Sequence, residues 1–418
     1  MRVRLAFLGA MFVVASTARG AVLFELHGIL SASGVNVESQ PSWMEGGFGR
    51  LDVGADAANR SKTVGRAFAQ IGADAYLTNW LSLHANTVAR AEPGDDGGRR
   101  AGVIEAYADV TPLETERHRL RLRGGMFFLP TSRENVGPMW SSPYTITFSA
   151  WNTWIAQELR PIGAELEYRN TVTANRQLSF AAGAFEGNDT SGTLLAWRGW
   201  AMGSRMTTYG EVLPLPPLFS LTDPALFGGR QRADGTKPFG KDLDGRIGWT
   251  ARVRWQIPRR FTIQLAGVDN RGDRELYHGE YAWYTEFLLL GADLHVTDRS
   301  TIAAEVAKGE TAMGVLIRPR VEAGFYTAYV LFSQELGEHR ISVRAETFQN
   351  DERDHSTAED DSEHGSALTL AYFFTPRNHL RLGAELVKLS AQRPAAAQSG
   401  ADPDTGGRTF TVEARWSW

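Results

Sequence analysis

The chain has 418 residues, 43% of them hydrophobic, with no cysteine and a formal net charge of −4. The acidic balance argues against nucleic acid as a partner. Without cysteine the chain has no disulfide framework, no thiol nucleophile and no Cys-ligated metal site, so its stability has to come from packing and backbone pairing.

Residues 1–20 have the features of a cleaved signal peptide. A short positive segment, "MRVR", precedes the apolar run "LAFLGAMFVVA", which is too short to span a bilayer, and Ala18 and Gly20 form a small-residue cleavage site. A single anchoring helix is the alternative interpretation. Removal of this segment leaves 41 basic against 48 acidic side chains, a net charge of −7. We therefore expect an exported chain.

The rest of the chain, 21–418, is predicted to be a single all-β domain. Apolar and charged residues alternate with a period of two in segments such as "RLRLRGGMFF" (119–128) and "RIGWTARVRWQI" (246–257). Many of these segments run for about nine to twelve residues, whereas strands of soluble proteins average roughly five or six. The length favours strands that cross a membrane.

An even number of strands is what closes a single-chain bacterial barrel. Our assignment, in chain order, places sixteen strands at 22–31, 66–77, 80–90, 102–110, 119–128, 161–172, 177–186, 245–257, 260–269, 282–296, 300–308, 322–333, 339–349, 365–374, 378–389 and 407–418.

The connections between these strands alternate in length. Short polar turns such as "TN" (78–79), "PRR" (258–260) and "TDRS" (297–300) join the members of a pair, and much longer segments join one pair to the next. This alternation predicts a sixteen-stranded antiparallel transmembrane β-barrel with short periplasmic turns and long extracellular loops. In hydrocarbon every backbone amide must be paired, and a closed barrel achieves this without an edge.

The segment 187–244 is predicted to be one long extracellular loop. A single strand around "RMTTYGEVL" (205–213) would reverse the direction of all later strands and move the short "PRR" turn to the long-loop side. The prolines of "LPLPPLF" (213–219) cannot donate to a ladder.

Aromatic residues next to the short turns predict a belt at the periplasmic rim. The last strand, "RTFTVEARWSW", is expected to close the barrel against "VLFELHGILS". Tyr281, Trp283 and Tyr284 are assigned to the opposite belt. The periplasmic belt comprises Trp80, Phe261, Tyr372, Phe374, Trp416 and Trp418.

The third long loop, 129–160, is far longer than a hairpin needs and carries Trp140, Trp151 and Trp154 among polar residues. A barrel of sixteen strands encloses an aqueous channel, so these aromatics have an inner wall on which to pack. We expect the loop to fold inward and set the constriction, with Arg133 and Glu134 as its charged lining. Packing over the rim, or onto a neighbouring subunit, is the alternative.

Part of the chain resembles a known family. The segment "GGMFFLPTSRENVGPMWSSPYTITFS" followed by "RPIGAELEY", about forty residues, is similar to the pore-loop region of the phosphate-selective porin O and P type family. The resemblance implies a sixteen-stranded trimeric porin with basic residues lining the eyelet. Pore lysines carry phosphate selectivity in that family, whereas this chain has five lysines and none on the third loop.

Arginines supply the inward positive charge instead. We expect the run Arg119, Arg121 and Arg123 to select ions. Like charges on one face of a strand repel one another unless acidic side chains or passing anions neutralise them. The alternative is cross-strand pairing with inward glutamates, which stiffens the wall. Arg344, Arg381 and Arg415 also face inward by alternation. The remaining predicted pore-lining arginines are Arg169, Arg252 and Arg254.

No catalytic or cofactor motif is present, and none of HExxH, GxSxG or GxxxxGK[ST] occurs. We therefore expect no enzyme, no cofactor and no metal centre. His84, the best-centred strand histidine, points inward by alternation. The acidic segment 351–364 is interpreted as a solvated loop, with a cation that bridges lipopolysaccharide as the alternative.

The sequence thus predicts a porin of the bacterial outer membrane, a passive diffusion channel for small hydrophilic solutes with an anion preference set by inward arginines. Its expected partners are outer-membrane lipid and lipopolysaccharide, the solutes themselves, and further copies of the chain in a homotrimer. The alternative function is a loop-plugged structural or adhesive barrel without transport activity.

Overall fold

The computed structural model describes residues 22–56, 60–92, 100–173, 175–315, 320–354 and 359–418. Sixteen strands in this part of the chain form one closed antiparallel barrel. Each barrel strand pairs with the next one along the chain, and the last pairs with the first. The strands are β1 (Leu23–Ser39), β2 (Ser61–Tyr76), β3 (Leu81–Ala91), β4 (Ala101–Glu114), β5 (His118–Met126), β6 (Ile162–Thr173), β7 (Arg176–Glu186), β8 (Gly248–Ile257), β9 (Phe261–Asp269), β12 (Tyr284–Thr297), β13 (Ser300–Met313), β14 (Val321–Leu336), β15 (His339–Glu352), β16 (Glu363–Arg377), β17 (Leu380–Gln392) and β18 (Gly407–Ser417).

The predicted fold class is confirmed, and every predicted strand overlaps one of these. The largest difference is β1, which continues to Ser39 although the prediction ended it at residue 31. Val35 and Val37 are buried there on the inward face, and Val37 belongs to the same apolar cluster as Trp200, which lies in a loop inside the barrel. The inner face of this stretch is apolar because it packs against loops instead of facing water. The alternation of apolar outward and polar inward residues therefore ends before the strand ends.

The outer surface of the barrel is apolar and its inner surface polar. On β8, Trp249, Val253 and Trp255 are exposed on the outside, whereas Arg252 is buried on the inside. This is the reverse of a water-soluble barrel and is what hydrocarbon around the wall requires. No helix among the described residues is long and apolar enough to cross a membrane.

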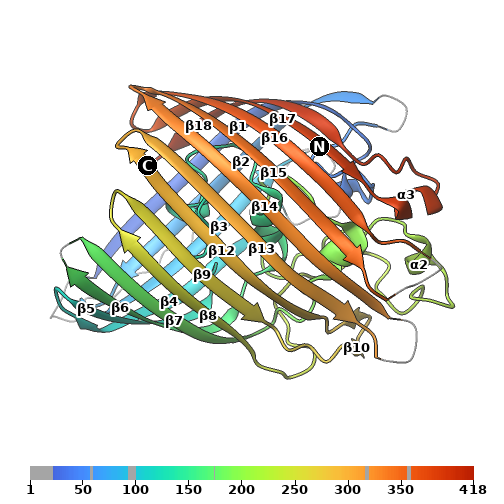
Figure 1. Cartoon of the computed structure of the whole chain (residues 1–418), viewed down its shortest axis with the longest axis horizontal. Coiled ribbons are helices and arrows are strands. Elements are labelled where there is room, and N and C mark those ends of the chain that lie inside the picture. Colours follow the sequence, from blue (N-terminus) through green and yellow to red (C-terminus); the bar gives the residue numbers. More distant parts are fainter. Residues whose placement is uncertain (1–21, 57–59, 93–99, 174, 316–319, 355–358) are drawn as a thin grey trace, which may run out of the picture.

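The two ends of the barrel differ, as Figure 1 shows. Short turns close one end, which we call the short-turn end. The opposite, long-loop end carries the two-stranded hairpin β10 (Leu276–Tyr277) and β11 (Glu280–Tyr281), with the short helices α2 (Phe219–Thr222) and α3 (Pro394–Gln398). A further helix, α1 (Ala150–Glu158), belongs to the third loop. Shorter helical turns are at Trp43–Glu45, Pro138–Trp140 and Leu194–Arg198.

The barrel closes between β1 and β18. Trp418 and Gly28 exchange two backbone hydrogen bonds, of 3.1 and 3.2 Å. The indole of Trp418 covers Gly28 so closely that a Cβ at position 28 would lie 2.0 Å from the ring. The last residue is therefore held by the ladder and by packing.

Four residues of the predicted periplasmic belt, Trp80, Phe261, Tyr372 and Phe374, lie beside short turns, and Trp416 and Trp418 lie at the same end of the barrel, where β18 ends beside the start of β17. Four of the side chains are exposed and two, Phe261 and Phe374, are half-buried. The exposed four are Trp80, Tyr372, Trp416 and Trp418.

The assignment of Tyr281 and Trp283 to an opposite belt is wrong. Trp283 is 0% exposed and packs edge-on against Trp197, with ring centroids 5.2 Å apart. Tyr281 is buried against Phe227. The long segment 187–244 supplies both partners, so these aromatics form a cluster under the loops rather than a surface towards lipid.

Candidate functional site in the barrel interior

The third loop folds into the barrel, and the alternative of outward packing is wrong. The backbone N–H groups of Ile146 and Thr147 donate to the carboxylate of Glu385 on β17, at 2.6 and 2.8 Å. That of Ala150 donates to Glu346 on β15, at 2.7 Å. Figure 1 shows α1 within the ring of strands. Two inward carboxylates of the far wall thus hold the loop by charge-assisted hydrogen bonds.

Glu134 is a buried anchor of this loop. It forms an ion pair with Arg344 of β15, and it accepts hydrogen bonds from the backbone of Ser149 at 2.9 Å and from Asn152 at 3.1 Å. Both partners of the ion pair are 0% exposed. The hydroxyl of Thr145 donates a third hydrogen bond at 3.2 Å. The prediction that Glu134 lines open water is therefore corrected: the carboxylate is enclosed in the packed loop, where Arg344 and these three donors neutralise and satisfy it.

A second loop also enters the barrel. Trp200, in the long connection between β7 and β8, is fully buried and packs edge-on against Trp154 and Phe325. Its backbone N–H donates to Glu363 at 2.8 Å, and Leu195 accepts from the side chain of Asn350 at 2.7 Å. The first part of this connection therefore fills the interior. The main prediction placed 187–244 outside as an extracellular loop, whereas the loop-plugged alternative took the same segment as the material of the plug.

The signal for this second loop was present in the sequence. The run "LLAWRGWAM" (194–202) is apolar and aromatic within a long connection, and the same argument that turned the third loop inward applies to it. Between β7 and β8 no barrel strand occurs, and α2 is the only α-helix there.

Glu158 joins the two loops. It accepts hydrogen bonds from the indole N–H of Trp154 at 2.5 Å and from the backbone of Leu194 at 3.0 Å. Burial raises the pKa of Glu158 to about 7, and these hydrogen bonds and the charge of Arg198 oppose the rise only in part. Both loops thus depend on one carboxylate outside the strands.

The arginine run on β5 faces inward, and each member has a carboxylate partner. Arg119 and Arg121 are half-buried, as is Arg123, whose guanidinium also lies 4.2 Å from the ring centroid of Tyr107. These contacts match the alternative interpretation of the run, in which inward arginines pair with carboxylates across neighbouring strands. The ion pairs are Arg119–Glu114 at 3.5 Å, Arg121–Glu167 at 3.4 Å and Arg123–Asp109 at 2.9 Å.

The predicted wall residues Arg252 and Arg169 differ in their surroundings. Arg252 is buried and pairs with Glu165 at 3.0 Å and Glu167 at 2.8 Å. Arg169 is half-buried and lies directly opposite Arg119 in the ladder. Within the described residues no carboxylate lies within 4.0 Å of Arg169.

Arg254 and Arg133 connect the third loop to the opposite wall. Arg254 donates to Gln264 at 3.1 Å and to the backbone carbonyl of Pro130 at the start of the loop. Arg133 forms an ion pair with Asp293 of β12 at 3.2 Å. Arg133 and Arg254 also line a cavity of about 660 Å³, so they border open space.

The open interior lies towards the short-turn end and narrows beneath the loops. Besides the 660 Å³ cavity there is one of about 400 Å³, followed by spaces of about 40 and 30 Å³. Ser141, Ser142 and Arg415 line both the 400 and the 40 Å³ spaces, and Ile146 and Glu92 line both the 40 and the 30 Å³ spaces. The narrow part runs between the third loop and strands β1, β2 and β18.

The charges along this narrow part are unevenly paired. Glu413 is shared by Arg381 at 3.2 Å and Arg415 at 3.0 Å, which leaves one excess positive charge. Further along, Arg66 sits between Asp52 at 3.0 Å and Glu92 at 2.8 Å. Alternation placed Arg381 and Arg415 inside, but only the docked loop shows that both border the 400 Å³ cavity and that Arg415 also borders the 40 Å³ space.

Neither a family model nor a curated protein matches this chain. Solved structures do. The outer membrane channel DcaP of Acinetobacter baumannii is 10% identical, with a TM-score of 0.56 over 97% of this chain and 100% of that one. The anion-selective porin from Comamonas acidovorans is 12% identical, with a TM-score of 0.53 over 95% and 100%. OmpF of Salmonella typhi, solved with daunomycin, is 12% identical, with a TM-score of 0.52 over 94% and 97%.

At these identities the likeness shows the fold, which is that of outer-membrane porins, and it does not single out the phosphate-selective family. A closed sixteen-stranded barrel with an apolar outer surface is a protein of the bacterial outer membrane.

Proposed function

We propose that this outer-membrane barrel is a porin, a non-enzymatic channel through which small hydrophilic solutes diffuse passively, with a preference for anions. The observation that carries the proposal is the sharing of Glu413 by Arg381 and Arg415. The excess positive charge lies where the 400 Å³ cavity meets the 40 Å³ space. Charged rings at a constriction are how pores select ions.

The proposed route runs along the wall made by β1, β2 and β18. One water needs about 10–15 Å³ of such space, so the 40 and 30 Å³ spaces each hold a few waters. A route of this width passes small ions and holds back larger solutes unless the loops move. We expect a small single-channel conductance, with the segment 141–148 as the moving wall.

The loop-plugged barrel remains the second candidate, and one observation favours it. Trp151, Trp154 and Trp200 pack with Phe287 and Phe325 into an apolar cluster inside the barrel. Such a cluster excludes water from the part of the lumen that it occupies. Under this reading the protein has a structural or adhesive role and conducts nothing.

Three finer features belong to the proposal. Phosphate is the anion that the family resemblance implies, and guanidinium groups bind it as bidentate forks. The chain assembles as a homotrimer surrounded by lipid and lipopolysaccharide. Residues 1–20, outside the described part of the chain, are removed as a signal peptide, and the constriction is formed by the third loop.

The test is single-channel recording of the purified barrel in a planar bilayer under a salt gradient, with and without phosphate. Open steps with an anion-selective reversal potential support the channel, and Arg415→Glu is expected to reverse the selectivity. The matched control is Arg408→Glu on the same strand, because Arg408 faces outward and pairs with Glu38 at the exposed rim. A folded, heat-modifiable barrel that stays silent supports the plugged alternative.

A further inference from the structure

A row of ionisable side chains crosses the inner wall near the short-turn end. Glu25 on β1 lies directly opposite Asp74 on β2, and Asp74 lies directly opposite His84 on β3. His27, two residues beyond Glu25, points to the same side. None of these residues lines the 40 or 30 Å³ spaces described above, although His27 also lines the 400 Å³ cavity.

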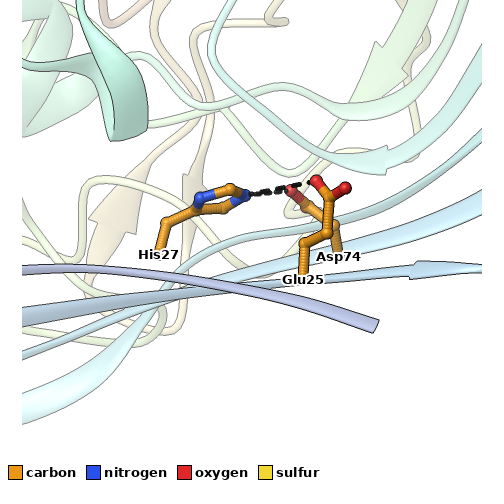
Figure 2. Close-up of side chains that lie close together, drawn as sticks. All are labelled: Glu25, His27 and Asp74. Carbon is orange, nitrogen blue, oxygen red and sulfur yellow. Dashed lines mark hydrogen bonds and ion pairs between the residues drawn. The ribbon is translucent and has the colours of Figure 1, made fainter. Parts of the chain in front are cut away.

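The side chains converge on one another, as Figure 2 shows for Glu25, His27 and Asp74. His27 Nε2 lies 2.9 Å from Asp74 Oδ2 and 3.9 Å from Glu25 Oε2. The ligand atoms of these three residues all lie within 4.8 Å of one another. On its other side Asp74 is held by His84, whose Nδ1 is 2.6 Å from Oδ1.

The placement of the two carboxylates is unfavourable without a cation. Like charges directly opposite each other on neighbouring strands destabilise the pair, and Glu25 and Asp74 are in that relationship. The guanidinium of Arg123, which lines the same cavity as Asp74, is paired with Asp109 instead. A divalent cation bound between the two carboxylates neutralises both of their charges. The imidazole of His27 is then the third protein ligand of that cation.

An ion can reach this position from open water. His27, Asp74 and His84 line the 660 Å³ cavity. The side chains of His27 and Glu25 are 40% and 45% exposed, so they are free to move the short distance to a common ion.

We propose that Glu25, His27 and Asp74 bind a divalent transition-metal cation, with Zn²⁺ as the reference ion. One imidazole nitrogen and two carboxylate oxygens form a ligand set that zinc accepts at about 2.0–2.2 Å, with a fourth position left to water. Nitrogen ligation favours zinc over calcium or magnesium, which prefer oxygen. His84 is a positioning residue: it fixes the second oxygen of Asp74, as outer partners of metal ligands do.

The first experiment measures Zn²⁺ binding to the tag-free, folded full chain in detergent by isothermal titration calorimetry, with Ca²⁺ in parallel. We expect one Zn²⁺ per chain and binding of Ca²⁺ at least about tenfold weaker. His27→Ala and Asp74→Asn are expected to abolish stoichiometric binding. His84→Ala is expected to weaken it about 10- to 100-fold, the usual effect of losing an outer partner.

The matched control is His295→Ala. His295 also faces the interior and lies 3.8 Å from a carboxylate, that of Asp293, but within the described residues it belongs to no group of three ligands. Its replacement is expected to leave Zn²⁺ binding unchanged. The inference is overturned if Zn²⁺ does not bind, if binding survives both His27→Ala and Asp74→Asn, or if His295→Ala abolishes it equally.

A second measurement separates this inference from the porin function. Zn²⁺ added to the short-turn side of a conducting bilayer is expected to change the conductance of the wild type and not that of His27→Ala. If the bilayer is silent while calorimetry still shows His27-dependent binding, the metal site stands and the channel proposal fails. If the channel conducts and calorimetry shows no Zn²⁺ binding, the channel proposal stands and the metal site fails.

Discussion

Glu134 and Arg344, 210 positions apart in the chain, form an ion pair in which neither side chain is exposed to water. The pair joins the start of the third loop to β15, and Glu346 holds the same guanidinium at 2.9 Å. Removing any one of these buried charged groups destabilises the folded loop, because the partner that remains is a buried charge without compensation.

Glu134→Gln is therefore expected to loosen the third loop. Removing one partner of a buried ion pair costs about 3–5 kcal/mol, and Arg344 keeps only Glu346 as a close carboxylate. We expect larger and noisier single-channel currents and a lower temperature for the heat-modifiable shift on gels. Glu38→Gln, which breaks the exposed Glu38–Arg408 pair, serves as the control with little effect. Equal effects of both substitutions would show that the buried pair does not hold the loop.

The arginines of β5 are expected to influence selectivity less than Arg415. Arg121 pairs with Glu167, and its neighbour Arg123 borders the 660 Å³ cavity, where water screens charge, whereas Arg415 borders the 40 Å³ space. Narrow, low-dielectric spaces focus the field of a charge. Arg121→Glu should shift the reversal potential by less than half of the shift caused by Arg415→Glu. A larger shift for Arg121→Glu would place the selective constriction at β5.

The docking of the two loops is expected to weaken as pH rises. Burial raises the pKa of Glu158 from its ordinary value of 4.5 to about 7. A carboxylate with a raised pKa stabilises the docked state fully below pH 4.5, and this stabilisation is lost as pH rises through 7. At 1.36 kcal/mol per unit the loss is on the order of 3 kcal/mol.

Hydrogen exchange of α1 and the fluorescence of its tryptophans, followed between pH 4 and 8, check this expectation. Glu158→Gln keeps an acceptor for the backbone of Leu194 but does not titrate, so its profile should lack the component present in the wild type. Identical pH profiles for the two proteins would assign the dependence to other groups.

Gly28→Ala is expected to weaken the closure of the barrel. The added methyl group meets the indole of Trp418 at 2.0 Å, and overpacking of this kind typically costs about 1–3 kcal/mol. Gly65→Ala on β2 is the matched control, since a Cβ there meets nothing within 4 Å. Urea unfolding in detergent measures the free energy of unfolding of both variants. In a Trp418→Ala background Gly28→Ala should cost little, and a cost that persists there would rule out the ring as the cause.

The strands of this barrel could be predicted because their pattern is local. Segments such as 246–257 face lipid on one side and a polar interior on the other, so each residue reports its own environment with a period of two. Parity of strand direction then excluded a strand at 205–213. For the same reason alternation alone placed Arg121, Arg381 and Arg415 inside.

Alternation does not say which groups meet, and here only the tertiary structure decided. Whether Glu134 borders water or Arg344, whether Trp200 lies outside or inside, and whether Glu25 stands opposite Asp74 depend on register and loop docking between distant segments. These contacts form only when the barrel closes and the loops leave water to pack against its inner wall. The sequence by itself therefore determined the barrel and its two faces, and the closed structure determined how its interior is filled and charged.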